Sequence, residues 1–156
     1  LKASFDYILV DCPAGIEQGF KNAIAAADEA IVVTTPEVSA TRDADRIIGL
    51  LEAAGIKNPR IVVNRLRIDM VKEKNMLSVE DILDILAVKL LGVVPDDENV
   101  VISTNKGEPL VYKGDSLAAK AFKNIASRIE GVEVPLLDLD VKMSILEKIK
   151  FVFKRW

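Results

Sequence analysis

Short, almost continuous runs of apolar residues alternate along the chain with stretches in which apolar residues recur every three or four positions. The runs are rich in β-branched residues and predict strands buried on both faces. They lie at 5–10, 30–35, 60–64 and 89–94. The spaced stretches predict helices, and they lie at 20–27, 44–51 and 118–129. Ser78 followed by Asp81 resembles a capping box and predicts the start of one more short helix.

This alternation runs through residues 1–130 and predicts one α/β domain with a mostly parallel, doubly wound sheet. Residues 131–141 show no helical spacing and include Pro135, so they are predicted to be a linker. Residues 142–156 form a separate terminal segment. Because the chain opens at Leu1 and enters an apolar run almost at once, we expect further residues to precede it in the natural protein.

The composition supports one folded domain and excludes several kinds of chemistry. The 156 residues are 50% hydrophobic, enough for a buried core and against intrinsic disorder. A single cysteine excludes an internal disulfide, and the absence of histidine excludes Ser-His-Asp catalysis and His-ligated zinc. No apolar run approaches the roughly 20 residues that span a bilayer. We therefore expect a cytoplasmic protein whose chemistry rests on carboxylates, Lys, Arg, backbone amides or a bound metal.

Polar or turn-forming residues follow the predicted strands, at the edge where open α/β sheets bind ligands. Asp11 ends the first run and is followed by Cys12, Pro13, Ala14 and Gly15. An aspartate in this place can hold Mg²⁺ through water, and the Pro-Ala-Gly turn lets backbone N–H groups approach a phosphate. A turn that caps the next helix explains these residues equally well. Cys12 has no base beside it, and we interpret it as a small, partly buried filler.

The third predicted strand ends in Asn64 and Arg65, and the fourth ends before Pro95, Asp96 and Asp97. The Asn64 amide could read an adenine edge while Arg65 stacks on the base or neutralises phosphate. Taken alone, these two residues are more typical of an ordinary loop entry.

The terminal segment 142–156 is basic and amphipathic. On a helix, the following apolar residues share about a third of the circumference: Ile145, Leu146, Ile149, Val152, Phe153 and Trp156. The basic residues outside that arc are Lys148, Lys150, Lys154 and Arg155, with Phe151 on their side. This pattern predicts an amphipathic helix that lies on an anionic membrane. A last helix packed on the domain, or a helix that binds a partner protein, remains an alternative.

The chain has a net charge of −3, and its carboxylates lie mainly before the basic terminal segment. The basic residues of that segment sit on a short aromatic helix rather than on a broad stripe. This distribution argues against binding to nucleic acid.

Together these segments resemble the MinD family of deviant Walker A ATPases, which is related to the ParA-type partition proteins. The resemblance covers essentially the whole chain, through FDYILVDCPAGIE, ADEAIVVTTPEVSATRDADRIIGLL, IVVNR, MLSVEDILDIL, LLGVVPDDENVVISTNKGEPLV and ILEKIKFVFKRW. It implies a P-loop NTPase fold, ATP and Mg²⁺ as cofactors, and an ATP-dependent homodimer that positions the division septum. It also implies attachment to the inner face of the cytoplasmic membrane, recruitment of a MinC-like inhibitor and stimulation by a MinE-like activator.

The resemblance also assigns residues. Asp11 matches the switch aspartate linked to Mg²⁺ through water, and Pro13, Ala14 and Gly15 match the loop that responds to the γ-phosphate. The adenine side of the pocket matches Asn64, Arg65 and Pro95. Asp43 and Asp45 match part of the surface that binds the protein partners, although from the residues alone an exposed, solvated helix face would be the simpler interpretation.

One departure from the family is large. No G-x-x-x-x-G-K-[ST] phosphate loop, in its usual or deviant form, occurs in these residues. We interpret the chain as the carboxyl-terminal part of such an ATPase, and we expect it to hydrolyse ATP poorly by itself. The alternatives are a flagellar-placement ATPase of the same group and a non-catalytic membrane-binding adaptor that has lost the loop.

Overall fold

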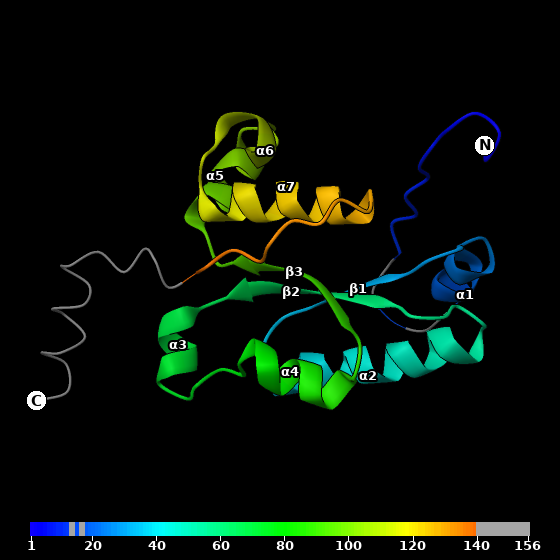
Figure 1. The fold of residues 1–156 in the computed structure, drawn as a ribbon, viewed down its shortest axis with the longest axis horizontal. Coiled ribbons are helices and arrows are strands. Elements are labelled where there is room, and N and C mark those ends of the chain that lie inside the picture. The colour runs from blue at the N-terminus through cyan, green and yellow to red at the C-terminus, as the bar shows by residue number, and fades with distance from the viewer. Residues whose placement is uncertain (13–14, 16–17, 140–156) are drawn as a thin grey trace, which may run out of the picture. The chain divides into compact units, whose positions relative to one another are not determined.

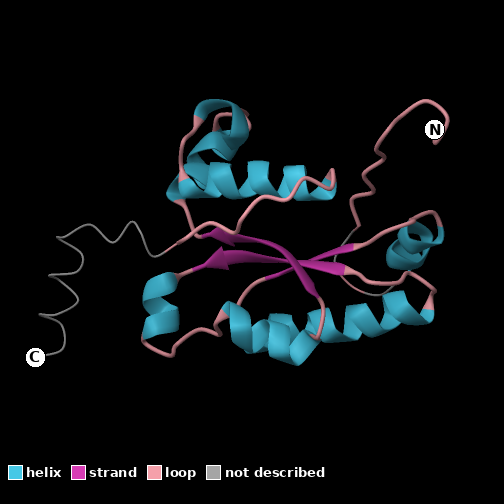
Figure 2. Ribbon diagram, in the orientation of Figure 1, coloured by secondary structure: helices cyan, strands magenta, loops and turns pink. Residues whose placement is uncertain are grey.

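The structure, a computed structural model, describes residues 1–12, 15 and 18–139 (Figure 1). It is an α/β fold in which helices and strands alternate (Figure 2). The elements are α1 (Gln18–Ala25), β1 (Ile31–Thr34), α2 (Val38–Ala53), β2 (Arg60–Leu66), α3 (Ile68–Lys72), α4 (Val79–Leu86), β3 (Lys89–Pro95), α5 (Glu98–Asn105), α6 (Leu110–Lys113) and α7 (Leu117–Ile129). The α/β class predicted from the sequence is confirmed.

The described sheet has the strand order β1-β2-β3. β1 and β2 run parallel, with Ile31 opposite Arg60 and Thr34 opposite Val63. The central strand β2 is the most deeply buried, because Ile61 and Val63 are both 0% exposed. β1 instead alternates between exposed and buried residues, which is typical of a strand covered on one face.

The chain packs as two compact units, and unit 1 comprises residues 1–63 and 77–91. Its α2 packs against β1 and α4, with Ala44, Ile48 and Leu51 buried on the side of α2 that forms the core. α2 ends before Gly55, whose φ of +89° favours glycine and reverses the chain, as the sequence predicts.

The predicted capping box at the start of α4 is present. The Ser78 hydroxyl accepts a hydrogen bond from the Asp81 N–H at 3.0 Å, and the Asp81 carboxylate accepts one from the Ser78 N–H at 2.9 Å. These reciprocal bonds satisfy two N–H groups that a helix start otherwise leaves unpaired. The same bonds hold the pKa of Asp81 below its usual range.

Unit 2 comprises residues 64–76 and the described residues from 92 onward. Its longest helix, α7, buries three alanines, Ala118, Ala119 and Ala121. Such small side chains allow a helix to approach its neighbours closely. Gly92 of β3 is equally tight, since a Cβ at this position would lie 2.4 Å from Cγ1 of Ile125 on α7. A larger residue at this position would therefore displace the Ile125 side chain or α7.

The prediction of a strand at residues 5–10 is wrong, because the structure has no strand there. The segment forms no helix or strand, and its apolar side chains are exposed, from 43% for Ile8 to 86% for Leu9. A buried parallel strand needs neighbours that supply hydrogen bonds along its edges and cover its faces. Among the described residues, the sheet that would supply them consists of β1, β2 and β3.

Residues 131–139 contain no helix or strand. The terminal segment 142–156, with its predicted membrane-binding residues, lies outside the described residues. Over the part of the chain that the structure describes, no helix has the length and apolarity needed to cross a membrane. The boundaries 1–130, 131–141 and 142–156 remain predictions.

Candidate functional site

The end of β2 has an unusual backbone conformation. Arg65 has φ +59°, a left-handed value that non-glycine residues adopt at a cost of roughly 1–3 kcal/mol. Its N–H donates a hydrogen bond to Oδ1 of the preceding Asn64 at 3.0 Å, which offsets part of that cost. Asn64 is half-buried, and the Arg65 side chain is exposed.

The end of β3 is joined to the end of β2 at this point. The Asp96 N–H donates to the carbonyl of Leu66 at 3.0 Å, and Asp96 Oδ1 lies 3.6 Å from Nε of Arg65. Pro95, directly before Asp96, is buried. The structure therefore brings together Asn64, Arg65 and Pro95, the three residues predicted from the resemblance to form one side of a nucleotide pocket.

The ion pair between Arg65 and Asp96 is loose. The two side chains are 71% and 43% exposed, and a pair so accessible to water contributes little to stability. The guanidinium can therefore exchange this carboxylate for a ligand at low cost. Its planar form also suits stacking on a base or binding to an oxyanion.

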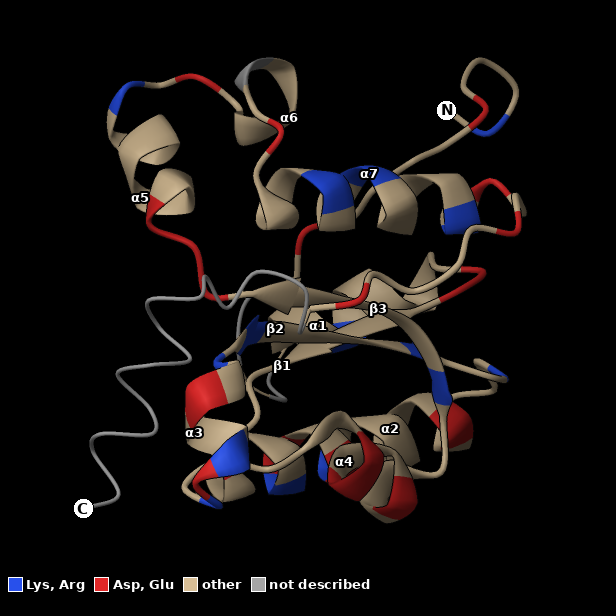
Figure 3. Ribbon diagram, turned by 60° about the vertical axis from the view of Figure 1, so that its left-hand side comes forward, with Lys and Arg blue, Asp and Glu red and all other residues tan. Residues whose placement is uncertain are grey.

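A second arginine follows on the same connection. Nη2 of Arg67 donates to Oδ2 of Asp69 on α3 at 2.7 Å. This hydrogen bond raises the pKa of Arg67, with smaller contributions from Asp96 and Glu73, and it lowers the pKa of Asp69. Figure 3 shows the charged positions along α3. Arg67 is thus held by its own carboxylate, whereas Arg65 is held only loosely.

Asp97 fixes the chain that follows β3. Its Oδ1 accepts hydrogen bonds from the N–H and the side-chain amide of Asn99 at 2.9 and 2.8 Å, which caps α5. Burial raises the pKa of Asp97, but hydrogen bonds from Asn99, Ser116 and Ala118 outweigh it and leave the pKa below its usual range. Because Ser116 and Ala118 begin α7, one carboxylate ties together the starts of two helices.

The predicted switch segment belongs to unit 1. Asp11 is exposed, and Gly15 has φ +103°, a value that favours glycine, with open space around its Cα. Pro13 and Ala14 lie outside the described residues. Cys12 is exposed, so its interpretation as a partly buried filler is wrong. The reason is the same as for residues 5–10, since no described strand or helix covers this stretch.

Asp11 fits one mode of magnesium binding. In the described ranges, no group of three carboxylate or thiol side chains gathers to enclose a metal. Mg²⁺ commonly keeps several waters and takes one or two carboxylates together with phosphate oxygens. A single exposed aspartate, acting through water, fits that mode and does not by itself make a site.

The residues predicted to bind partners lie on α2. Asp43 and Asp45 are both exposed, between Arg42 and Arg46, which are exposed as well. Figure 3 shows charges of both signs along α2 and acidic positions on α4, which packs against it. Both carboxylates are therefore accessible to solvent, and their role in binding partners remains a prediction.

Comparison with known proteins identifies the family. The family model "ParA: NUBPL iron-transfer P-loop NTPase" matches residues 3–130. The chain belongs to the ParA family of P-loop NTPases. Within this family it is similar to the septum site-determining protein MinD of Synechocystis, with 62% identity over 139 residues, which are 88% of this chain and 52% of that protein.

Two solved structures support the same assignment. The chain is similar to MinD in a MinC:MinD complex from Aquifex aeolicus, with a TM-score of 0.83, 47% identity and coverage of 88% of this chain and 57% of that one. It is also similar to MinD complexed with Mg-ADP from Pyrococcus horikoshii, with a TM-score of 0.75, 33% identity and coverage of 83% and 52%. The resemblance to MinD is confirmed, and the chain spans about half the length of the relatives that it matches.

Proposed function

We propose that this chain is part of a MinD-type ATPase that helps to determine the site of the division septum. Within that protein it supplies the switch segment around Asp11, the adenine side of the nucleotide pocket and the membrane-binding segment. Three findings support the proposal: membership of the ParA family, 62% identity to a MinD protein and similarity to a MinD structure that holds Mg-ADP.

The main observation behind the proposal is that the end of β2 is hydrogen-bonded and ion-paired to Asp96, directly after β3. An amide side chain and an exposed guanidinium lie at the end of β2, and a buried proline ends β3, beside the Asp96 that bonds to both Leu66 and Arg65. An amide both donates and accepts hydrogen bonds, as the edge of adenine requires. The guanidinium of Arg65 can stack on the base, and Pro95 is buried directly before Asp96. The strained backbone at Arg65 supports a role in binding, because such strain clusters at functional sites.

Asp11 is proposed to act at the phosphate side, where it would hold Mg²⁺ through water, with Pro13, Ala14 and Gly15 as the turn that senses the γ-phosphate. Bound Mg²⁺ and ATP would supply the charge neutralisation and the cleavable bond of the reaction. The Gly-rich phosphate loop and its lysine are not among these 156 residues. The isolated chain is therefore expected to bind nucleotide weakly and to hydrolyse it poorly.

The membrane part of the proposal rests on residues 142–156. The apolar residues from Ile145 to Trp156 would enter the lipid, and the lysines and Arg155 would contact anionic headgroups. One short helix binds weakly, so an ATP-dependent homodimer with two such helices would bind far better through avidity. In this way nucleotide state would decide between the cytoplasm and the inner face of the membrane.

The charged surface of α2, including Asp43 and Asp45, is proposed to bind a MinC-like inhibitor and a MinE-like activator. Both carboxylates are exposed, and the MinD relative from Aquifex aeolicus has been solved in a complex with MinC. A charged, accessible helix favours fast association steered by electrostatic attraction.

The test of the nucleotide role is to join residues 1–156 to the part of the Synechocystis relative that this chain does not match. The joined protein should hydrolyse ATP. Arg65→Ala should raise its KM for ATP about tenfold or more, because a charge-assisted contact is lost. Arg67→Ala is the matched control, since its guanidinium is held by Asp69. Equal effects of the two variants would contradict the proposed role of Arg65. A folded joined protein without ATPase activity would contradict the proposed function and favour the adaptor alternative.

The membrane role has its own matched pair. Phe153 lies on the apolar face of the predicted terminal helix, and Phe151 lies on the basic side. Phe153→Glu should abolish sedimentation with vesicles that contain phosphatidylglycerol, whereas Phe151→Glu should change it little. Retained binding of Phe153→Glu would refute the predicted helix face. Affinity capture of a flagellar protein in place of a MinC-like inhibitor would favour the flagellar-placement alternative.

A further inference from the structure

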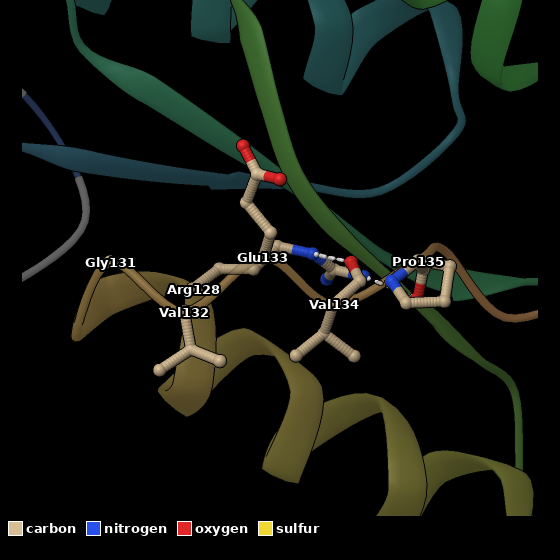
Figure 4. A pocket seen from close by; sticks show the side chains of 6 residues that line it. All are labelled: Arg128, Gly131, Val132, Glu133, Val134 and Pro135. Atoms are coloured by element: carbon tan, nitrogen blue, oxygen red, sulfur yellow. Dashed lines mark hydrogen bonds between the residues drawn. The ribbon is translucent and has the colours of Figure 1, made fainter.

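The chain reverses direction directly after α7. Gly131 has φ +82°, the Val132 N–H donates to the carbonyl of Ser127 at 2.9 Å, and the Gly131 N–H donates to that of Arg128 at 3.2 Å. This pair of bonds is a Schellman motif, which ends a helix and turns the chain back. The residues that follow pass the last turn of α7 (Figure 4).

Arg128 holds this returning segment. Its Nε donates to the carbonyl of Val134 at 2.9 Å, and its Nη2 donates to the carbonyl of Pro135 at 2.8 Å. The rigid guanidinium thus bridges two consecutive carbonyls with charge-assisted hydrogen bonds. Figure 4 shows both bonds, with Val132 and Val134 on one side of the segment and Glu133 on the other, as in an extended chain.

The bonds from Arg128 are not needed to end the helix. The carbonyls of the last turn already accept hydrogen bonds from the N–H groups of Glu130, Gly131 and Val132. The guanidinium of Arg128 also lies near β3, because Nη1 is 3.4 Å from the position that a Cβ on Gly92 would take. The two donated bonds therefore act on the segment 132–135.

We propose that Arg128 is a clasp that pins residues 132–135 to α7, so that the first part of the predicted linker stays ordered against the last turn of this helix. The clasp does not rest on the proposed function.

The clasp is tested by proteolysis of the full chain at Glu133, whose exposed side chain lies within the pinned segment. A glutamyl endopeptidase cleaves only when such a segment opens, so the rate of cleavage reports the open fraction. Arg128→Met keeps an aliphatic stem and removes both donors. It should speed cleavage after Glu133, measured by mass spectrometry, about tenfold. Lys123→Ala, which removes an exposed cation from the same helix, should cleave as the wild type does.

Cleavage of Arg128→Met at the wild-type rate, with unchanged circular dichroism, would overturn the proposal. If Arg128→Met does not fold, Arg128→Lys replaces it. This variant keeps the charge but cannot bridge two carbonyls in a planar fork, and unchanged cleavage would overturn the clasp equally.

Sedimentation with phosphatidylglycerol vesicles separates the clasp from the proposed function. Faster cleavage of the variant, together with a wild-type chain that does not sediment, would refute membrane attachment and support the clasp. Unchanged cleavage together with normal sedimentation would refute the clasp and leave membrane attachment intact.

Discussion

Replacing Gly92 with alanine tests the packing of β3 against α7. The added Cβ would lie 2.4 Å from Cγ1 and 2.9 Å from Cδ1 of Ile125. Carbon atoms in good contact are about 3.5–4.0 Å apart, so a gap of about 1 Å must open. Gly92 is buried in a strand of the sheet, which leaves the Ile125 side chain or α7 itself to move.

The expected cost follows from this overlap. Forcing an extra methyl group into a packed contact costs about 1–3 kcal/mol. Replacing glycine also lowers the conformational entropy of the unfolded chain, which stabilises the folded protein by about 0.4–1 kcal/mol. We therefore expect Gly92→Ala to lower the free energy of unfolding by about 1–2 kcal/mol. With a typical urea dependence, the unfolding midpoint should fall by roughly 0.5–1 M.

The assay is urea unfolding followed by circular dichroism. The matched control is Gly49→Ala on α2, where a Cβ meets nothing within 4 Å, and this variant should gain about 0.5–1 kcal/mol. In an Ile125→Ala background, the Gly92→Ala change should lose its cost, because the overlapping atoms are gone. A midpoint for Gly92→Ala at or above that of the wild type, or a cost that persists without the Ile125 side chain, would refute this reasoning.

Three further predictions concern other parts of the chain. Ser78→Ala removes the cap of α4 and should cost about 1 kcal/mol in urea unfolding; an unchanged midpoint would contradict the capping geometry. The folded pKa of Asp97 lies below its unfolded value, so its stabilising contribution is present above about pH 4 and is lost as the pH falls through the folded value. Asp97→Asn should flatten the stability profile below about pH 4, measured by urea unfolding at pH values from 5 down to 2, and an identical profile would count against it. Leu9→Ser should change stability by less than about 0.5 kcal/mol because Leu9 is 86% exposed; a loss near 2 kcal/mol would instead favour the buried strand that the sequence predicts.

Much of the fold could be predicted because its signals are local. The strands β1, β2 and β3 follow from runs such as Arg60–Asn64, and the start of α4 follows from the spacing of Ser78 and Asp81. Both signals depend on residues within one element. α5 gives no such signal, since its apolar residues are consecutive and Val101 and Ile102 remain exposed. The one available sign of α5 was Asp97, an N-cap residue directly before it.

Residues 5–10 show where a hydrophobic pattern misleads. The pattern records which side chains favour burial, but a strand also needs a neighbour with free N–H and C=O groups. Among the described residues no neighbour pairs with this segment. The same limit applies to the candidate site. The sequence predicted Asn64, Arg65 and Pro95 as site residues, but it did not predict the left-handed backbone of Arg65 or the hydrogen bond from the Asp96 N–H to the carbonyl of Leu66.

The hydrogen bonds of Arg128 are another feature that the sequence could not predict. Its partners are backbone carbonyls, which every residue has, so no pairing of residue types could reveal them. Residues 131–141 are predicted to be a linker because they lack helical spacing. Such a segment is easily assumed to make no hydrogen bonds to the domain. The informative residue was Gly131, because a glycine after a helix turns the chain back along the helix. A cation in the last helical turn then meets the returning carbonyls, and the first part of a linker becomes ordered. A helix followed by glycine, with an arginine three residues before it, is therefore a pattern in which the length of a linker should not be counted from the end of the helix.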